Sequence, residues 1–171
     1  MKLTKWKLSL IAAIGFAFSG TASAQNTQDI VVTAFVPNVC IVDVATTETT
    51  MDFDLSGVAA AVAPFDATTV LAWRCSAGFN TEITIGPGTS GDQENRALFN
   101  GVLSLAYNLY TDNTFGTIWG DGTGTTSTVA IAGTGMANVG NTTVYGRIPL
   151  AAAQAATTGI YTDTVLVTVV F

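Results

Sequence analysis

The chain has 171 residues, no histidine, two cysteines and a formal net charge of −6 at pH 7. The lack of histidine removes the most common general base and every catalytic arrangement built on an imidazole ring. The acidic balance repels the phosphate backbone of nucleic acids. The composition therefore excludes a histidine-dependent enzyme and argues against a nucleic-acid-binding protein.

Residues 1–24 have the layout of a secretory signal peptide. Three lysines precede an apolar stretch at 8–18, and Ala22-Ser23-Ala24 forms a small-residue cleavage site. The apolar stretch is short for a membrane anchor. We expect cleavage after Ala24, which leaves 147 residues with three arginines, twelve acidic side chains and a net charge of −9. A chain of this length suits one domain.

The first expected strand follows a short polar segment and ends at Pro37. One face of its alternating pattern carries four apolar side chains, those of Ile30, Val32, Ala34 and Val36. Two interpretations stay open from the pattern alone. The strand either pairs within its own domain, or it is a free arm that adds a strand to the sheet of another chain.

Cys40 and Cys75 are the only cysteines. An even pair in an exported chain predicts one disulfide, because the compartments outside the cytoplasm are oxidising. Closing this loop would stabilise the fold by about 4 kcal/mol in the chain-entropy model. A zinc site is the alternative, but two cysteines without histidine fall short of a zinc shell. We therefore predict a disulfide and no metal.

Short β-branched or alternating segments recur between turn residues such as Gly86-Pro87-Gly88 and Gly120-Asp121-Gly122. We expect strands at 30–44, 50–55, 68–75, 81–86, 101–110, 126–132, 142–150 and 161–171. Strands this short and this numerous predict an all-β sandwich or barrel of Greek-key type.

Two segments between the strands are expected to be loops. The alanine-rich run at 150–156 follows Pro149 and is compatible with a short helical turn, but we favour a loop. The Gly- and Thr-rich stretch at 112–128 lacks both the Gly-Lys-Ser/Thr ending of a phosphate loop and the regular acidic spacing of a calcium loop. A glycine-kinked hairpin loop is the better interpretation.

Carboxylates are the remaining candidates for catalysis. Asp52 with Asp54, and Asp92 with Glu94, are the closest acidic pairs in the sequence, and glycoside hydrolysis requires two facing acids. Each pair lies in turn-like or polar surroundings, where acidic side chains are usually solvated. We predict no catalytic residue and no cofactor.

Trp73 and Trp119 are the residues on which an alternative function, carbohydrate binding, would depend. A self-complete secreted β-sandwich that binds carbohydrate would use such tryptophans as stacking surfaces. Buried aromatic side chains are the more common case, so we expect both rings to belong to the core.

The last segment, 161–171, is apolar on both faces. One face carries Val165, Val167, Val169 and Phe171. Chain ends are normally polar and frayed, so this ending indicates a terminus that is held by partners.

Six segments carry a family resemblance. They are the alternating arm that ends four residues before Cys40, the Trp73-Arg74-Cys75 strand, Leu-Ala-Tyr-Asn-Leu-Tyr-Thr-Asp at 105–112, Trp-Gly-Asp-Gly-Thr at 119–123, Val-Tyr-Gly-Arg-Ile-Pro at 144–149, and the ending at 159–171. In this order behind a signal peptide, they resemble the spore coat protein U-like family, the pilins of archaic chaperone–usher fibres in Gram-negative bacteria. The resemblance spans essentially all of the chain after residue 24.

The resemblance implies an incomplete immunoglobulin-like Greek-key β-sandwich at 39–171, completed by a donor strand from a neighbouring subunit. The arm at 25–38 would be the donor, and Ile30, Val32, Ala34 and Val36 would be its inserted side chains. Val165, Val167, Val169 and Phe171 would belong to the strand that borders the acceptor groove.

The resemblance also implies the partners and the location. A periplasmic chaperone would fill the groove first, and neighbouring subunits of a homopolymer would replace it at an outer-membrane usher. The product would be a pilus on the cell surface that supports adhesion and biofilm formation.

Overall fold

The computed structural model describes residues 27–43 and 50–171. The expected signal peptide at 1–24 lies outside the described residues. The described residues 27–35 lie in a unit separate from the domain, Val36–Phe171. The expected boundaries at 24/25 and 38/39 remain predictions.

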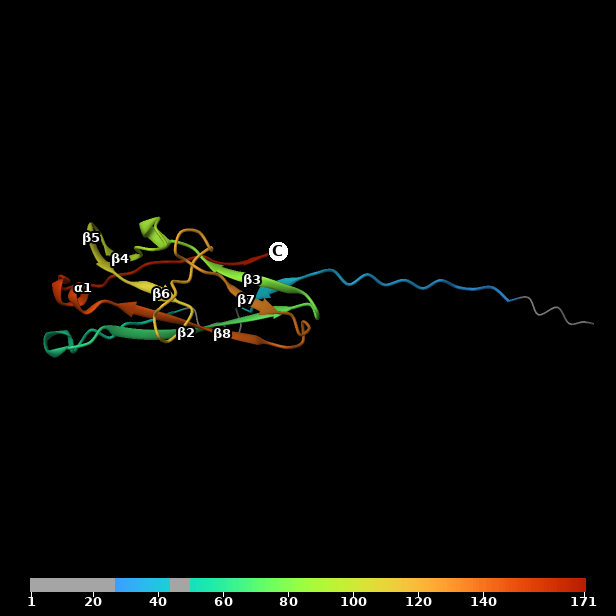
Figure 1. Ribbon diagram of the computed structural model, residues 1–171, viewed down its shortest axis with the longest axis horizontal. Helices are drawn as coiled ribbons and strands as arrows, with labels where there is room; N and C mark the ends of the chain where they lie inside the picture. Colours follow the sequence, from blue (N-terminus) through green and yellow to red (C-terminus); the bar gives the residue numbers. More distant parts are fainter. Residues whose placement is uncertain (1–26, 44–49) are drawn as a thin grey trace, which may run out of the picture. The chain divides into compact units, whose positions relative to one another are not determined.

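The domain is built from antiparallel strands in two main sheets and a hairpin (Figure 1). The first sheet has the order β1-β2-β8-β6, with β1 at Cys40–Val42, β2 at Phe65–Cys75, β8 at Gly140–Ile148 and β6 at Asn108–Tyr110. The second has the order β7-β3-β9, with β7 at Val129–Ala132, β3 at Asn80–Ile85 and β9 at Val167–Val170. The hairpin joins β4 at Ala97–Asn100 to β5 at Leu103–Ala106.

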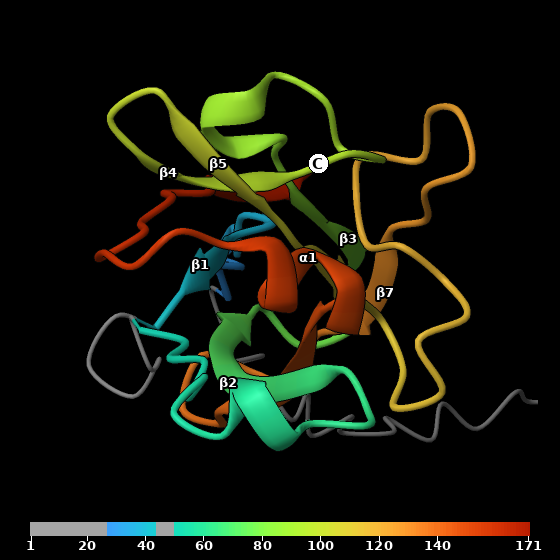
Figure 2. The ribbon, with the colours of Figure 1, turned by 90° about the vertical axis from the view of Figure 1, so that its left-hand side faces the viewer.

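Three short helical segments complete the described part of the domain. The α-helix α1 spans Leu150–Ala155, and the 3-10 turns η1 and η2 span Val58–Ala60 and Gly88–Ser90. Figure 2 views the domain from the end at which α1 lies. None of the described helices is long and apolar enough to cross a membrane.

The pairing of β2 with β8 is the longest in the domain, running from Phe65↔Ile148 to Trp73↔Gly140. It forms because both segments are rich in Thr and Val, which suit a pleated surface. Gly140 is required at its end, since a Cβ there would lie 2.2 Å from Cζ2 of Trp73.

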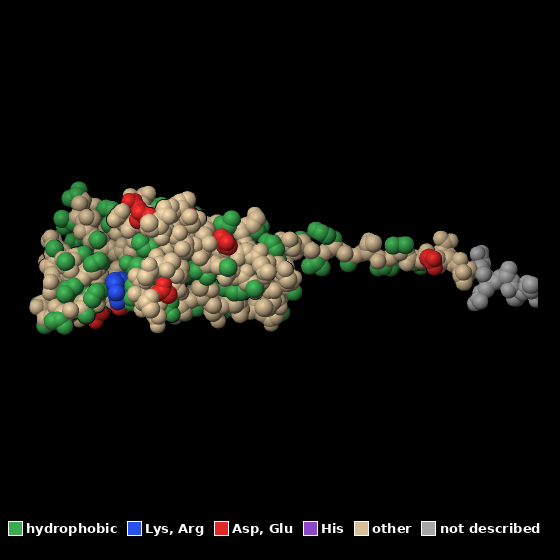
Figure 3. Space-filling model, viewed as in Figure 1, with side chains coloured by type: hydrophobic (Ala, Val, Ile, Leu, Met, Phe, Trp, Pro, Cys, Tyr) green, Lys and Arg blue, Asp and Glu red, His purple; other side chains and the backbone are tan. Residues whose placement is uncertain are grey.

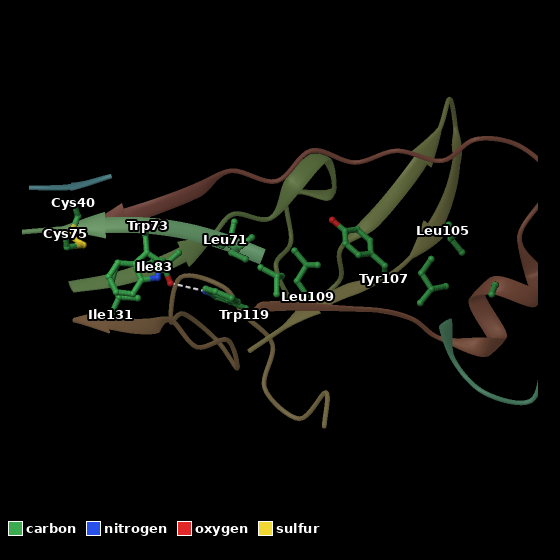
Figure 4. Close-up of a cluster of buried hydrophobic side chains, with 14 residues drawn as sticks. Cys40, Leu71, Trp73, Cys75, Ile83, Leu105, Tyr107, Leu109, Trp119 and Ile131 are labelled. Atoms are coloured by element: carbon green, nitrogen blue, oxygen red, sulfur yellow. Dashed lines mark hydrogen bonds between the residues drawn. A yellow bond between two sulfur atoms is a disulfide. The ribbon is translucent and has the colours of Figure 1, made fainter. Parts of the chain in front are cut away.

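The core lies between the two main sheets (Figure 4). Leu71 and Val144 come from the first sheet, and Ile83 and Ile131 from the second. Trp119 is fully buried among them, and its indole N–H donates to the carbonyl of Ile83 at 2.9 Å. A buried indole N–H normally needs such a partner.

Trp73 is also buried, and its Nε1 donates to Oγ1 of Thr142 at 3.1 Å. The expectation that both tryptophans belong to the core is therefore confirmed. Neither ring is available as a stacking surface for carbohydrate.

The all-β expectation is confirmed, and the departures from it are local. The segment at 101–110 is divided into β5 and β6 at Tyr107. The strand β4 precedes them because Gly101-Val102 makes a tight turn between Asn100 and Leu103, with Gly101 at φ 59°. The run at 150–156 was expected to be a loop, which is wrong. The helix α1 forms because alanine has the highest helix propensity and Ala153 is buried against the core.

Two expected strands are shortened or absent in the structure. Residues 27–39 have no strand pairing, so the expected strand at 30–44 is reduced to β1. Residues 50–55 also lack ladder pairing, although their alternation holds: Met51, Phe53 and Leu55 are half-buried, while Asp52 and Asp54 are exposed. A strand is defined by a hydrogen-bonded neighbour, which a side-chain pattern alone does not supply.

Candidate functional site: an apolar cleft beside the last strand

The last strand, β9, lies at the edge of its sheet. It pairs with β3 from Glu82↔Val170 to Ile85↔Val167, and within the described part of the chain β3 is its only strand partner. The amide of Gly86 donates to the carbonyl of Leu166 at 2.8 Å, which continues this ladder. The backbone groups of residues 165, 167 and 169 therefore point away from β3, as the alternation of an antiparallel ladder requires.

The side chains of this segment divide into two sets. Val165, Val167 and Val169 are half-buried against the core. Leu166 and Phe171 are largely exposed, and the Phe171 ring packs edge-on against Phe79 with centroids 5.9 Å apart. An apolar edge strand with exposed side chains is a template for pairing with another strand.

A cleft of about 390 Å³ opens beside the first half of this segment. Buried side chains of both main sheets line it, namely Leu71, Ile85, Leu109 and Val144. Half-buried apolar side chains also line it, namely Val42, Met51, Phe53, Leu98, Val165 and Val167. The lining includes two of the four expected groove residues, Val165 and Val167, but not Val169 or Phe171.

The segment at 50–55 contributes Met51 and Phe53 to the cleft. Both lie over Gly146 of β8, where a Cβ would be 2.3 Å from the Met51 sulfur and 2.8 Å from Cζ of Phe53. The Phe53 ring also contacts the Tyr107 ring edge-on at 6.3 Å. Gly146 is therefore needed to seat these two side chains at the cleft.

One end of the cleft is polar. The hydroxyl of Tyr107 donates to Oδ2 of Asp163 at 2.7 Å, and the amides of Thr89 and Thr164 donate to Oδ1, both at 2.8 Å. Burial opposes ionisation of Asp163, but these hydrogen bonds outweigh it and lower the pKa of the carboxyl. Burial, reinforced by the bond to Asp163, raises the pKa of Tyr107.

Arg96 lies behind this end of the cleft and is only 1% exposed. Its guanidinium donates to Oδ1 of Asn108 at 2.7 Å and to four carbonyl oxygens, those of Ile85, Gly86, Gln93 and Trp119, at 2.8–3.2 Å. Desolvation lowers the pKa of Arg96. The sequence pattern alone does not single out Arg96, Tyr107 or Asp163 as a connected group, and its one signal is a lone acid, Asp163, near the start of the apolar C-terminal segment.

Three of the four candidate carboxylates accept backbone amides, Asp54 and Asp92 within local turns and Glu94 from a distant loop. Asp54 accepts the amide of Ser56 at 2.9 Å, Asp92 accepts that of Glu94 at 2.9 Å, and Glu94 accepts that of Thr125 at 2.6 Å. All four acids of the two pairs are exposed. Among the described residues, no three His, Cys, Asp or Glu side chains gather as metal ligands.

Cys40 and Cys75 form a disulfide with a Cα–Cα distance of 4.1 Å. They are opposite each other in the ladder between β1 and β2. The bond joins the three-residue strand β1, which supplies Val42 to the cleft, to the central strand β2.

The four expected donor side chains belong to a segment without strand pairing. Ile30, Val32 and Val36 are 79–86% exposed, and Ala34 is exposed as well. Figure 3 shows apolar side chains standing out along this extended segment. A row of exposed apolar side chains is unusual on a soluble protein and is typical of a surface that binds a partner.

Comparisons with known proteins agree with this geometry. A family model described as Spore Coat Protein U domain matches residues 26–168. Among solved structures, the chain is similar to one in the CsuC–CsuE chaperone–tip adhesion subunit pre-assembly complex from the archaic chaperone–usher Csu pili of Acinetobacter baumannii, with a TM-score of 0.54 and 19% identity. The match covers 80% of this chain and 40% of that one, so this chain spans less than half of that relative. No curated protein matches the chain. At this identity the likeness concerns the fold, which is the all-β fold of a chaperone–usher pilus subunit.

Proposed function

Because the chain belongs to the Spore Coat Protein U domain family, we propose that it is a structural pilin subunit of a chaperone–usher surface fibre. Subunits polymerise by donor-strand exchange, in which the arm of one chain adds a strand to the domain of the next. The observation that carries the proposal is the free edge of β9 beside an apolar cleft, in a chain whose N-terminal segment is exposed and alternately apolar.

The donor and the acceptor match in length. Residues 30–36 carry four apolar side chains on one face. Residues 165–171 carry three on the face toward the core, Val165, Val167 and Val169, and Phe171 follows them in the alternation. Each segment of seven residues spans about 20 Å when extended. Each Val or Ile that becomes buried contributes roughly 1.5–3 kcal/mol, part of which is offset by the entropy of ordering the arm.

The topology of the domain favours one direction of insertion. Cys40, where the chain enters the domain, pairs with Cys75, and Phe171 packs against Phe79 just beyond that strand. The entry point and the C-terminus therefore lie at the same end, and Asp163 lies toward the other. If the donor domain lies beyond the Asp163 end, its Val36 reaches Val165 first and the inserted arm runs antiparallel to β9.

The partners follow from the same edge. An open apolar groove is an aggregation hazard, so a periplasmic chaperone would cover it before an outer-membrane usher passes the subunit to its neighbour. The similar solved complex pairs a chaperone with a tip adhesion subunit, which supports this order. The fibre would lie on the cell surface and support adhesion and biofilm formation, and the chain would have no enzymatic role.

The test compares two chains expressed in the periplasm, one starting at residue 25 and one starting at residue 37. We expect the first to form linear polymers that resist heat, and the second to stay unstable until a synthetic 25–36 peptide is added. Size analysis and thermal unfolding measure both outcomes. Equal stability of the two chains as monomers would sink the proposal.

A matched pair of peptides sharpens the test. Val32→Asp places a charge on the face that enters the cleft, and rescue should be lost because a buried unpaired charge is costly. Val31→Asp places the same charge on the opposite face, and rescue should persist. Equal behaviour of the two peptides would mean that the alternation of the arm is not what the cleft recognises.

A further inference from the structure

The chain enters the domain through hydrogen bonds to one serine. Ser76 directly follows β2 and is only 9% exposed. The amide of Val39 donates to Oγ of Ser76 at 3.1 Å, and this hydroxyl donates to the carbonyl of Pro37 at 3.0 Å. The amide of Ser76 donates in turn to the carbonyl of Val39 at 2.8 Å. Three hydrogen bonds thus hold the chain at residues 37–39.

A hydroxyl is needed at this position because the backbone cannot supply the same contacts. The carbonyl of Ser76 accepts the amide of Phe79 at 3.1 Å in the turn before β3. Pro37 has no amide hydrogen with which to extend the ladder. The Ser76 side chain is both acceptor and donor, so it carries the pairing past the disulfide of Cys40 and Cys75.

Neighbouring backbone packs tightly against Ser76, which together with residues 37–39 we call the joint. The amide of Gly133 donates to the carbonyl of Phe79 at 2.7 Å. A Cβ at Gly133 would lie 2.0 Å from the carbonyl oxygen of Ser76 and 2.7 Å from that of Phe79. The segment after β7 therefore packs directly against the turn that holds the serine. The backbone is therefore held at the carbonyl of Pro37 and at Val39.

We propose that Ser76 is a positioning residue of the fibre. It fixes the direction in which the arm leaves the domain, and so it sets the angle between one subunit and the next. The inference rests on the proposed function of the arm as a donor strand. Without the hydroxyl, only the hydrogen bond from the Ser76 amide to the Val39 carbonyl would remain. Residues 37 and 38 would then rotate about Val39, and the angles between subunits would vary more widely.

The experiment uses polymers of the chain that starts at residue 25. Ser76→Thr and Ser76→Val form a matched pair of nearly equal shape that differs in the hydroxyl, and Ser76→Ala removes it with less bulk. Ser90→Ala is the control, because that hydroxyl also donates to a proline carbonyl, Pro87, and accepts an amide, that of Asp92, away from the joint. Electron microscopy measures the angles between consecutive subunits, and hydrogen exchange measures the amide of Val39.

We expect the Val and Ala variants to form polymers whose angular spread is at least twice that of the wild type, with faster exchange at the Val39 amide. The Thr and Ser90→Ala variants should resemble the wild type. An unchanged spread in the Val and Ala variants despite faster exchange overturns the positioning role and leaves the proposed function standing. Absence of polymers from the wild-type chain overturns the proposed function, and the role of Ser76 with it.

Discussion

Arg96 stabilises the domain through hydrogen bonds to carbonyl groups and not through an ion pair. Its guanidinium ties the end of β3 to the segment that carries Trp119 and to Asn108 of β6. Removing it would leave several buried acceptors without donors, each of which costs roughly 1–3 kcal/mol.

Arg96→Met should therefore lower the free energy of unfolding of the peptide-complemented domain by at least about 3 kcal/mol. Denaturant unfolding measures the effect. The control is Arg147→Met, which removes an exposed ion pair with Asp66 and a contact with the Phe115 ring, and should cost about 1 kcal/mol. Equal losses of unfolding free energy in the two variants would show that the buried hydrogen bonds of Arg96 stabilise the domain no more than the exposed contacts of Arg147.

Asp163 makes the stability of the cleft depend on pH. Its folded pKa is lowered, so the ionised form stabilises the domain above the ordinary carboxyl pKa of about 4. This contribution is lost as the pH falls through the folded pKa. In Asp163→Asn, the loss of stability relative to the wild type should be largest near neutral pH and shrink toward about pH 3. Thermal unfolding across this range measures it, and a difference that does not change with pH would contradict the assignment.

The arm has one small side chain, Ala34, on the face that would enter the groove. In the proposed antiparallel register Ala34 would lie beside Val167, which lines the cleft of about 390 Å³. Replacing this alanine with leucine would bury more apolar surface, which should make the free energy of binding more favourable by roughly 2 kcal/mol.

A 25–36 peptide with Ala34→Leu should therefore bind the truncated domain at least about tenfold more tightly. Calorimetry measures the affinity. Thr33→Leu is the matched control on the opposite face of the strand and should change the affinity much less. A gain that appears only for the control would reverse the face assigned to the cleft.

The elements differ in how far the sequence predicts them. The strands β2, β3 and β8 follow from β-branched residues between turns, and the disulfide follows from an even cysteine pair in a chain for which export is predicted. The helix α1 and the strand β4 do not, because a six-residue helix and a four-residue strand carry too little periodicity.

The candidate site divides in the same way. The terminal valines stand out in the sequence because alternation places them on one face, and two of them, Val165 and Val167, line the cleft. The role of Met51 and Phe53 depends on their packing over Gly146. The role of Ser76 depends on its carbonyl being bound by the amide of Phe79, which leaves the hydroxyl to bind the amide of Val39. Both are contacts between distant segments, which no local pattern contains.

At the scale of the whole molecule, the positive charges are few and engaged. After residue 24 the chain has no lysine and three arginines. Arg74 pairs with Asp43 at 2.5 Å, Arg147 pairs with Asp66 at 2.6 Å, and Arg96 is buried. The face in Figure 3 accordingly shows mostly apolar and uncharged polar side chains.

This distribution predicts resistance to trypsin, which cleaves after lysine and arginine. The three sites lie in or beside paired strands, so cleavage requires local opening. Polymers of the chain starting at residue 25 should survive a digestion that degrades the chain starting at residue 37 without its peptide. Gel electrophoresis over time measures this. Rapid cleavage of the polymer at Arg147 would show that the strand pairing there is weaker than the structure indicates.

In the proposed fibre, the arm becomes a new strand on the free edge of β9. The amides of Val167 and Val169 point to this edge, while those of Thr168 and Val170 point to β3. Strand addition is therefore tested by hydrogen exchange of the truncated domain, measured by NMR with and without the 25–36 peptide. We expect the peptide to slow exchange at Val167 and Val169 by at least about a hundredfold, beyond any change at Thr168 and Val170. A peptide that binds while the amides of Val167 and Val169 exchange as fast as before would contradict strand addition at this edge.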